Sequence, residues 1–177
     1  MKTLILYYSQ CGHTKRYAED LHVRIGGDLK EAKTISRRML KEYDTIFFGG
    51  PLRGNTILKL KNLMKHYNVI KDKNIFIFAD GLSTISANND TKDLVITTND
   101  LDEKHVRLYL LPGGLDLQLM KPLKRKFFRF LINVVGKKED VPGSANLKMI
   151  IDHPIDMVNP AHLDRMVTVY NKISRGF

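Results

Sequence analysis

The sequence predicts an α/β fold, a doubly wound sheet of five parallel strands with helices on both faces. Short, continuously apolar stretches at residues 2–8, 44–51, 74–79 and 106–111 are typical of strands that are buried on both sides. Segments with apolar residues at helical spacing separate several of these strands. Polar residues, glycine or proline follow each strand and indicate loops. This alternation of strands and helices favours a parallel sheet.

The first half of the chain predicts six elements. After the first strand, a helix is expected from near His13, with Tyr17, Ala18, Leu21 and Ile25 on its apolar face. Residues 28–35 indicate a weak second strand, and residues 36–42 a short helical turn. We expect Gly49-Gly50-Pro51 to end the strand at 44–51, with a loop over 52–55. The next helix is predicted from the spacing of Ile57, Leu60, Leu63, Met64 and Tyr67.

The second half predicts two further apolar strands and a final helix. Residues 86–105 are polar and indicate a short or poorly formed helix, and Pro112-Gly113-Gly114 should end the strand at 106–111. A basic amphipathic segment at 119–135, a loop at 137–145 and a short strand at 147–152 are expected next. Asn159 and Pro160 are typical of a helix start, and Leu163, Met166, Val167, Tyr170 and Ile173 form the apolar face of the last helix.

Composition limits the class of protein. The 177 residues are enough for a single domain, 1–177, and no linker or repeat is visible. The chain has one cysteine, no stretch long and apolar enough to span a membrane and no signal peptide, so we expect a cytoplasmic protein. The six histidines lack metal-binding spacing, so no metal site is predicted. The net charge of +10 favours acidic partners, but no nucleic-acid-binding motif is present, so we do not expect nucleic acid as a partner.

The loop between the first strand and the first helix is the leading candidate for a binding site. It consists of Ser9, Gln10, Cys11, Gly12, His13 and Thr14. Backbone N–H groups at a helix start, a glycine and two hydroxyl groups suit a phosphate. An ordinary turn in which Ser9 or Thr14 caps the helix is the alternative. Two more loops, Pro51–Thr56 and Asp80–Asn88, follow other strands and should meet the first at the carboxyl edge of the sheet.

These three loops, in this order and spacing, resemble those of the flavodoxin superfamily. The resemblance rests on Tyr8–Thr14, Gly49–Gly54 and the Asp80 loop, and it covers nearly the whole chain. It implies a flavodoxin-like fold with FMN as the cofactor, its phosphate in the first loop and its ring between the other two. The implied FMN-binding residues are Ser9, Gln10, Cys11, Gly12, His13, Thr14, Pro51, Leu52, Arg53, Gly54, Asn55, Asp80, Gly81, Leu82 and Ser83.

The second half is more similar to the bacterial flavodoxin-type protoporphyrinogen oxidases, which are quinone-dependent dehydrogenases. Those enzymes are basic and carry a basic, aromatic helical insertion, matched here by Gly113-Gly114 and then Lys121–Leu131, within an insertion at about 115–146. The resemblance implies oxidation of protoporphyrinogen IX in heme biosynthesis, with a quinone-type acceptor. The chain departs from the pattern: its second and third loops lack the usual stacking aromatic residues, and the insertion lacks a tyrosine-rich start.

Several roles remain open. Arg53 is the candidate catalytic residue, which could stabilise reduced flavin, pair with a substrate carboxylate or simply be solvated. Asp80 could contact the ring or only shape its turn. The basic segment at 119–138 could contact a membrane peripherally on its inner face, contact an acidic substrate or expose a solvated surface. The alternatives to an oxidoreductase are a flavodoxin-like electron carrier and a non-catalytic module that binds a protein or membrane.

Overall fold

The computed structural model describes residues 1–82, 84, 89–102, 105–116, 118, 122–123, 125–126, 129–130 and 154–176. Five parallel strands form a sheet in the order β2-β1-β3-β5-β6. They are β1 (Thr3–Tyr7), β2 (Asp28–Glu31), β3 (Thr45–Arg53), β5 (Asn74–Gly81) and β6 (Val106–Pro112). The chain begins inside the sheet, adds β2 on one side of β1 and then β3 on the other, which makes the fold doubly wound. The predicted fold class is confirmed.

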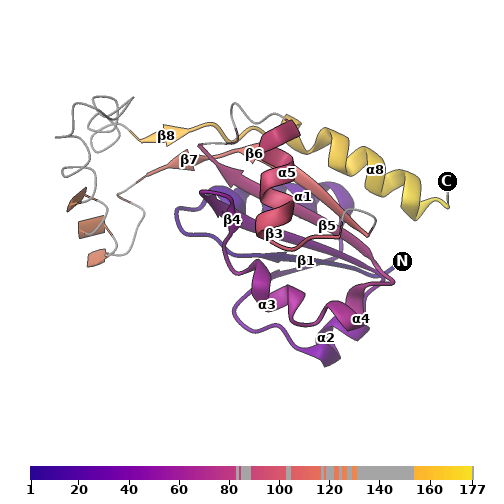
Figure 1. The fold of residues 1–177 in the computed structure, drawn as a ribbon. Coiled ribbons are helices and arrows are strands. Elements are labelled where there is room, and N and C mark those ends of the chain that lie inside the picture. Colours follow the sequence, from indigo (N-terminus) through magenta and orange to yellow (C-terminus); the bar gives the residue numbers. More distant parts are fainter. Residues whose placement is uncertain are drawn as a thin grey trace.

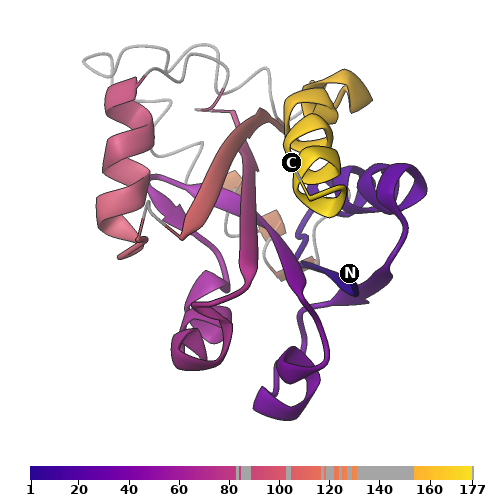
Figure 2. The same cartoon turned by 90° about the vertical axis from the view of Figure 1, so that its right-hand side faces the viewer.

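Helices cover both faces of the sheet (Figure 1; Figure 2). One face carries α1 (His13–Ile25) and α8 (Asp164–Ser174), which pack in one apolar cluster. The other face carries α2 (Arg37–Lys41), α3 (Leu60–Met64), α4 (Tyr67–Ile70) and α5 (Asn89–Thr98), which share a second cluster. The sheet therefore has two cores, and its strands are hydrophobic on both sides for this reason.

The central strand β3 illustrates how one apolar run supplies both cores. Ile46 and Phe48 belong to the cluster beneath α2–α5, whereas Phe47 belongs to the cluster beneath α1 and α8. Successive side chains of a strand point to opposite faces, so three adjacent apolar residues are all buried. The ring of Phe47 stacks on that of Phe76 from β5, with 4.5 Å between centroids.

The prediction that Gly49-Gly50-Pro51 ends this strand is wrong. β3 continues to Arg53 and pairs antiparallel with β4 (Thr56–Ile57). A Cβ atom at Gly49 would lie 2.2 Å from the ring of Phe78, so glycine is needed for close packing rather than for chain reversal. The β1 ladder ends at the Tyr7–Gly49 pair, so Pro51 costs no hydrogen bond to β1.

The predicted helix that begins near Ile57 is also wrong in its extent. Ile57 lies in β4, and the segment that follows forms two short helices, α3 and α4, rather than one. The apolar residues are nevertheless buried as their spacing suggests: Ile57, Leu60 and Leu63 belong to the same cluster. Periodicity identified the buried face but could not distinguish a strand end from a helix start.

The other predicted elements divide between the described and the undescribed parts of the chain. The short helical turn, the helix within 86–105 and the last helix are confirmed as α2, α5 and α8, and the weak second strand is confirmed as β2 although it ends at Glu31 instead of Ile35. The last helix follows η2 (Pro160–Leu163), where the Ala161 N–H donates to the Asn159 side chain. Most of the basic segment at 119–135, the loop at 137–145 and the strand at 147–152 lie outside the described residues.

A two-stranded ribbon brackets the segment in which the insertion was predicted. β7 (Gly114–Leu115) pairs antiparallel with β8 (Ile155–Asp156), so the chain leaves and returns at one place beyond β6 (Figure 1). In the part of the chain that the structure describes, no helix is long and apolar enough to cross a membrane.

Candidate functional site

A cleft of about 280 Å³ lies at the carboxyl edge of the sheet, where the three predicted loops meet. The first loop, the β3–β4 hairpin, the end of β5 and the start of β7 each contribute to its wall. The residues that line it are Ser9, Gln10, Cys11, His13, Thr14, Pro51, Leu52, Arg53, Gly54, Leu58, Asp80, Gly81, Leu82, Gly114 and Leu115. Parallel α/β sheets bind their ligands at this position.

The first loop has the geometry of an anion-binding helix start. Gly12 adopts a left-handed conformation with φ of 90°, and its N–H donates to the Ser9 hydroxyl oxygen at 3.0 Å. The N–H of Arg16 donates to the Gly12 carbonyl, which closes the first turn of α1. The N–H groups of residues 13–15 precede that bond and lie at the positive end of the helix. This arrangement suits a phosphate.

A buried hydrogen bond joins the first loop to β5. The hydroxyl of Thr14 donates to Oδ1 of Asp80 at 2.5 Å, and both residues are almost completely buried. Burial raises the pKa of Asp80 to about 6, although the Thr14 hydroxyl favours the ionised form. The expected phosphate ligand Thr14 therefore has a protein carboxyl group as its partner in this structure.

The hairpin supplies an apolar wall and a cation. Pro51 and Leu52 line the cleft, and the side chain of Arg53 is exposed at its edge. Arg53 Nη2 donates to the Gln10 side-chain oxygen at 3.4 Å, which links the second loop to the first. Arg53, the candidate catalytic residue, thus lies beside the predicted phosphate loop.

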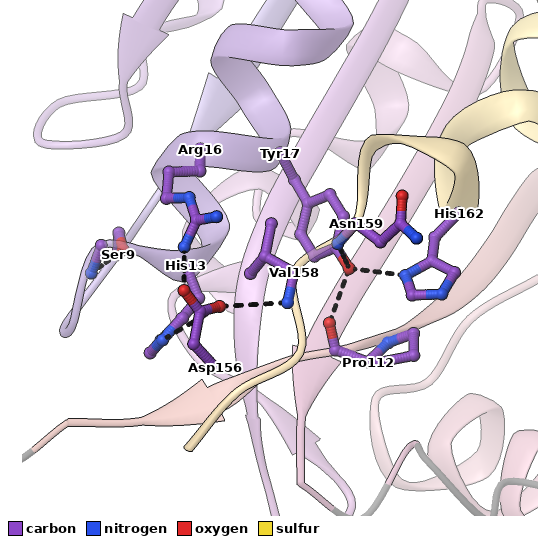
Figure 3. A network of polar contacts seen from close by, with 10 residues as sticks. Ser9, His13, Arg16, Tyr17, Pro112, Asp156, Val158, Asn159 and His162 are labelled. Atoms are coloured by element: carbon purple, nitrogen blue, oxygen red, sulfur yellow. Dashed lines mark hydrogen bonds and ion pairs between the residues drawn. The ribbon is translucent and has the colours of Figure 1, made fainter. Parts of the chain in front are cut away.

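The β7–β8 ribbon is held against the start of α1, as Figure 3 shows. Arg16 of α1 donates to Asp156 of β8, and His13 Nε2 lies 3.9 Å from the same carboxylate. A Cβ atom at Gly114 would lie 2.6 Å from His13 Nε2, so only glycine allows this approach. Burial lowers the pKa of His13, which keeps its imidazole neutral at pH 7.

A second set of contacts fixes α1 against the segment that follows β8 (Figure 3). The buried hydroxyl of Tyr17 donates to the Pro112 carbonyl at 2.7 Å and lies 2.9 Å from His162 Nδ1. Burial raises the pKa of Tyr17 to about 12, so this hydroxyl keeps its proton. These hydrogen bonds position α1 and its first turn relative to β6.

Most of the predicted site residues come together. Of those that the structure describes, all but Gly12 and Asn55 line the cleft; Gly12 shapes the loop, and the Asn55 carbonyl accepts from Asn99 at 2.7 Å. Ser83 lies outside the described residues. The sequence reasoning missed Leu58, Gly114 and Leu115, and the only signal for them was the Gly-Gly pair noted as a strand end.

The family model described as a flavodoxin domain matches residues 4–141, most of the chain and all three loops. The chain belongs to the flavodoxin domain family. Membership confirms the predicted cofactor, FMN. The family includes electron carriers and oxidoreductases, so membership alone does not choose between them. No curated protein matches the chain.

Several solved flavoproteins are similar to the chain at low identity. A flavoprotein in complex with FMN from Lactobacillus acidophilus is 19% identical, with 63% of this chain and 91% of that chain covered and a TM-score of 0.44. Oxidised flavodoxin 2 from Bacillus cereus is 17% identical, with 73% and 96% covered and a TM-score of 0.42. A WrbA-like flavodoxin from Agrobacterium tumefaciens is 16% identical, with 86% and 98% covered and a TM-score of 0.43. Likenesses of this size carry no information on function.

The donor set of the cleft fits FMN. Backbone N–H groups and the Ser9 hydroxyl suit the phosphate, and Leu52 and Leu82 offer apolar contacts to the ring. Among the described lining residues there is no Phe, Tyr or Trp, so ring stacking depends on aliphatic side chains. One group opposes the phosphate: the carboxyl of Asp80, which lies under the same helix start.

Proposed function

We propose that this flavodoxin-family protein is an FMN-dependent oxidoreductase that acts on a small acidic molecule. When bound, FMN supplies the redox chemistry, and the chain binds it, orients it and sets the charge around it. The observation that carries the proposal is the position of Arg53, an exposed cation at the edge of the cleft and next to the phosphate loop. A guanidinium group at this point suits a substrate carboxylate or the negative charge of reduced flavin.

Protoporphyrinogen IX is the candidate substrate, with a quinone-type molecule as the electron acceptor. The net charge of +10 suits a substrate with carboxylates, and the sequence at 121–131 resembles the insertion of the oxidases that use it. The start of β7 both lines the cleft and leads into the insertion, which supports a role for the insertion near the substrate. Contact of residues 119–138 with an anionic membrane would give access to quinones, which dissolve in the bilayer.

The test begins with FMN binding and continues to turnover. Purified apoprotein is titrated with FMN by fluorescence quenching, and the loaded protein is then mixed with protoporphyrinogen IX and a soluble quinone under anaerobic conditions. We expect saturable quenching and porphyrin fluorescence that appears faster than with free FMN. Arg53→Ala should lower kcat/KM about tenfold, the effect of losing one charge-assisted hydrogen bond.

Arg38→Ala is the matched control, because Arg38 is an exposed arginine of α2 outside the cleft lining and its loss changes the net charge equally. It should leave kcat/KM unchanged. Bound FMN that passes electrons to the quinone after chemical reduction, without porphyrin formation, would identify an electron carrier instead. Failure to bind FMN at all would leave only the binding-module interpretation.

A further inference from the structure

The carboxyl group of Asp80 occupies an unusual place for an acid in a phosphate-binding site. Asp80 lies in β5, yet its Oδ1 accepts a 2.5 Å hydrogen bond from Thr14, the second residue of α1. Only 4% of Asp80 and 1% of Thr14 are exposed. A negative charge on Asp80 would therefore lie at the helix start that is to receive the FMN phosphate, with little water to screen it.

The described groups around Asp80 do not neutralise this charge. On α1, His13 is held neutral by burial, and the hydroxyl of Tyr17 keeps its proton. On the hairpin, Arg53 is exposed and donates to Gln10, and β7 contributes only Gly114 and Leu115 to the cleft. Across the described ranges, no salt bridge to Asp80 is formed. One helix start would thus hold two anions when FMN is bound.

We infer that the cleft binds FMN together with a proton, which the carboxylate of Asp80 takes up from solvent as the phosphate enters. The inference rests on the proposed binding of FMN in the cleft and adds the residue that regulates it. A protonated Asp80 still accepts the Thr14 hydrogen bond through its carbonyl oxygen, but it no longer repels the phosphate. Asp80 then also discriminates between flavins, because riboflavin lacks the phosphate and needs no proton.

The protonation equilibrium of Asp80 supports this inference and sets its pH range. Burial already raises its pKa to about 6 in the free protein, and a neighbouring phosphate dianion raises it further. Below about pH 6 the proton is present before FMN binds, so binding has no proton requirement. Above about pH 6, the dissociation constant of FMN rises as the pH rises. Once the pH exceeds the pKa of Asp80 in the complex, the dissociation constant no longer changes with pH.

The test compares the affinity of FMN for the wild-type protein and for Asp80→Asn. Fluorescence quenching is measured from about pH 5 to about pH 8.5, a range chosen to span the titration of Asp80. We expect the two dissociation constants to agree within about twofold at the acid end and to differ about tenfold or more at the basic end, with the variant tighter. The phosphate of free FMN also titrates near pH 6, but the free ligand is the same for both proteins and its titration cancels in the ratio.

Two controls isolate the role of Asp80. Asp164→Asn also removes an acid that pairs with an arginine of α1, Arg24, but Asp164 is exposed and outside the cleft lining, so this variant should leave the dissociation constant of FMN unchanged at every pH. With riboflavin, the wild-type protein and Asp80→Asn should show a ratio of dissociation constants that does not vary with pH. Calorimetry of the wild-type protein in buffers of different ionisation enthalpy should show proton uptake on FMN binding at about pH 7.5.

The outcomes separate the inference from the proposal on which it rests. If FMN binds but the wild-type to variant ratio is constant with pH, or calorimetry finds no proton uptake, the inference is overturned and the cofactor assignment stands. If neither protein binds FMN at any pH, the assignment itself fails. A variant that does not fold is recognised by its thermal transition, and the calorimetric result on the wild-type protein then decides.

Discussion

Two aspartates hold the first turn of α1, and they do so under opposite conditions. Asp80 accepts from Thr14 in the interior and has no cationic partner among the described residues. Asp156 accepts from Arg16 at the surface, with His13 3.9 Å away. The pKa of Asp80 is raised by burial, whereas partial burial of Asp156 is outweighed by Arg16 and its pKa is lowered. The same type of side chain can therefore take up a proton near neutral pH at position 80 and stays ionised at that pH at position 156.

The largest effect should come from removing the hydroxyl that donates to the buried acid. Thr14→Val leaves the Asp80 carboxyl without its side-chain donor, so we expect the free energy of unfolding to fall by about 3 kcal/mol at neutral pH. Urea denaturation measures the loss. Thr14→Ser keeps the hydroxyl and removes only the methyl group, so it should lose less than half as much; a loss in Thr14→Ser as large as that in Thr14→Val would contradict the dominant role of the hydrogen bond.

Asp80→Asn should stabilise the protein at neutral pH. A folded pKa of about 6, above the ordinary aspartate value of 3.8, means that the folded state binds the proton more tightly than the unfolded state. The contribution of Asp80 to stability is therefore full below pH 3.8 and is lost as pH rises through about 6. The amide avoids that loss, so we expect a gain of about 2 kcal/mol at neutral pH and almost none near pH 4. Urea denaturation at the two pH values tests this; a gain of the same size at both would contradict the titration.

Asp156→Asn should have the smallest effect and the opposite pH profile. Its lowered pKa means that its stabilising contribution is present above the unfolded value and lost only in acid, below pH 3.8. The pair with Arg16 is exposed, so the loss at neutral pH should be about 0.5 kcal/mol and should vanish in high salt. A loss above that of Thr14→Val would show that the β7–β8 ribbon, not the buried bond, secures α1.

The fold could be predicted from the sequence because the patterns that indicate strands and loops are local. Ile46-Phe47-Phe48 predicts a strand buried on both faces wherever it occurs, and three such strands with loops behind them place a cleft at one edge. The wrong prediction of the end of β3 came from applying a local rule where a contact with another strand decides. Glycine next to proline usually ends a strand, but Gly49 is required by the ring of Phe78, a residue of another strand.

The order of strands and helices, the edge at which the cleft lies and the loop for the phosphate follow from residue patterns along the chain, since burial and helix starts have periodic and short-range signatures. The charge in that cleft does not follow from such patterns. Thr14 and Asp80 are separated by 66 residues, and Arg16 and Asp156 by 140. Packing alone brings each pair together, buries one carboxyl group and exposes the other, and the protonation of an acid depends on those surroundings rather than on its neighbours in sequence.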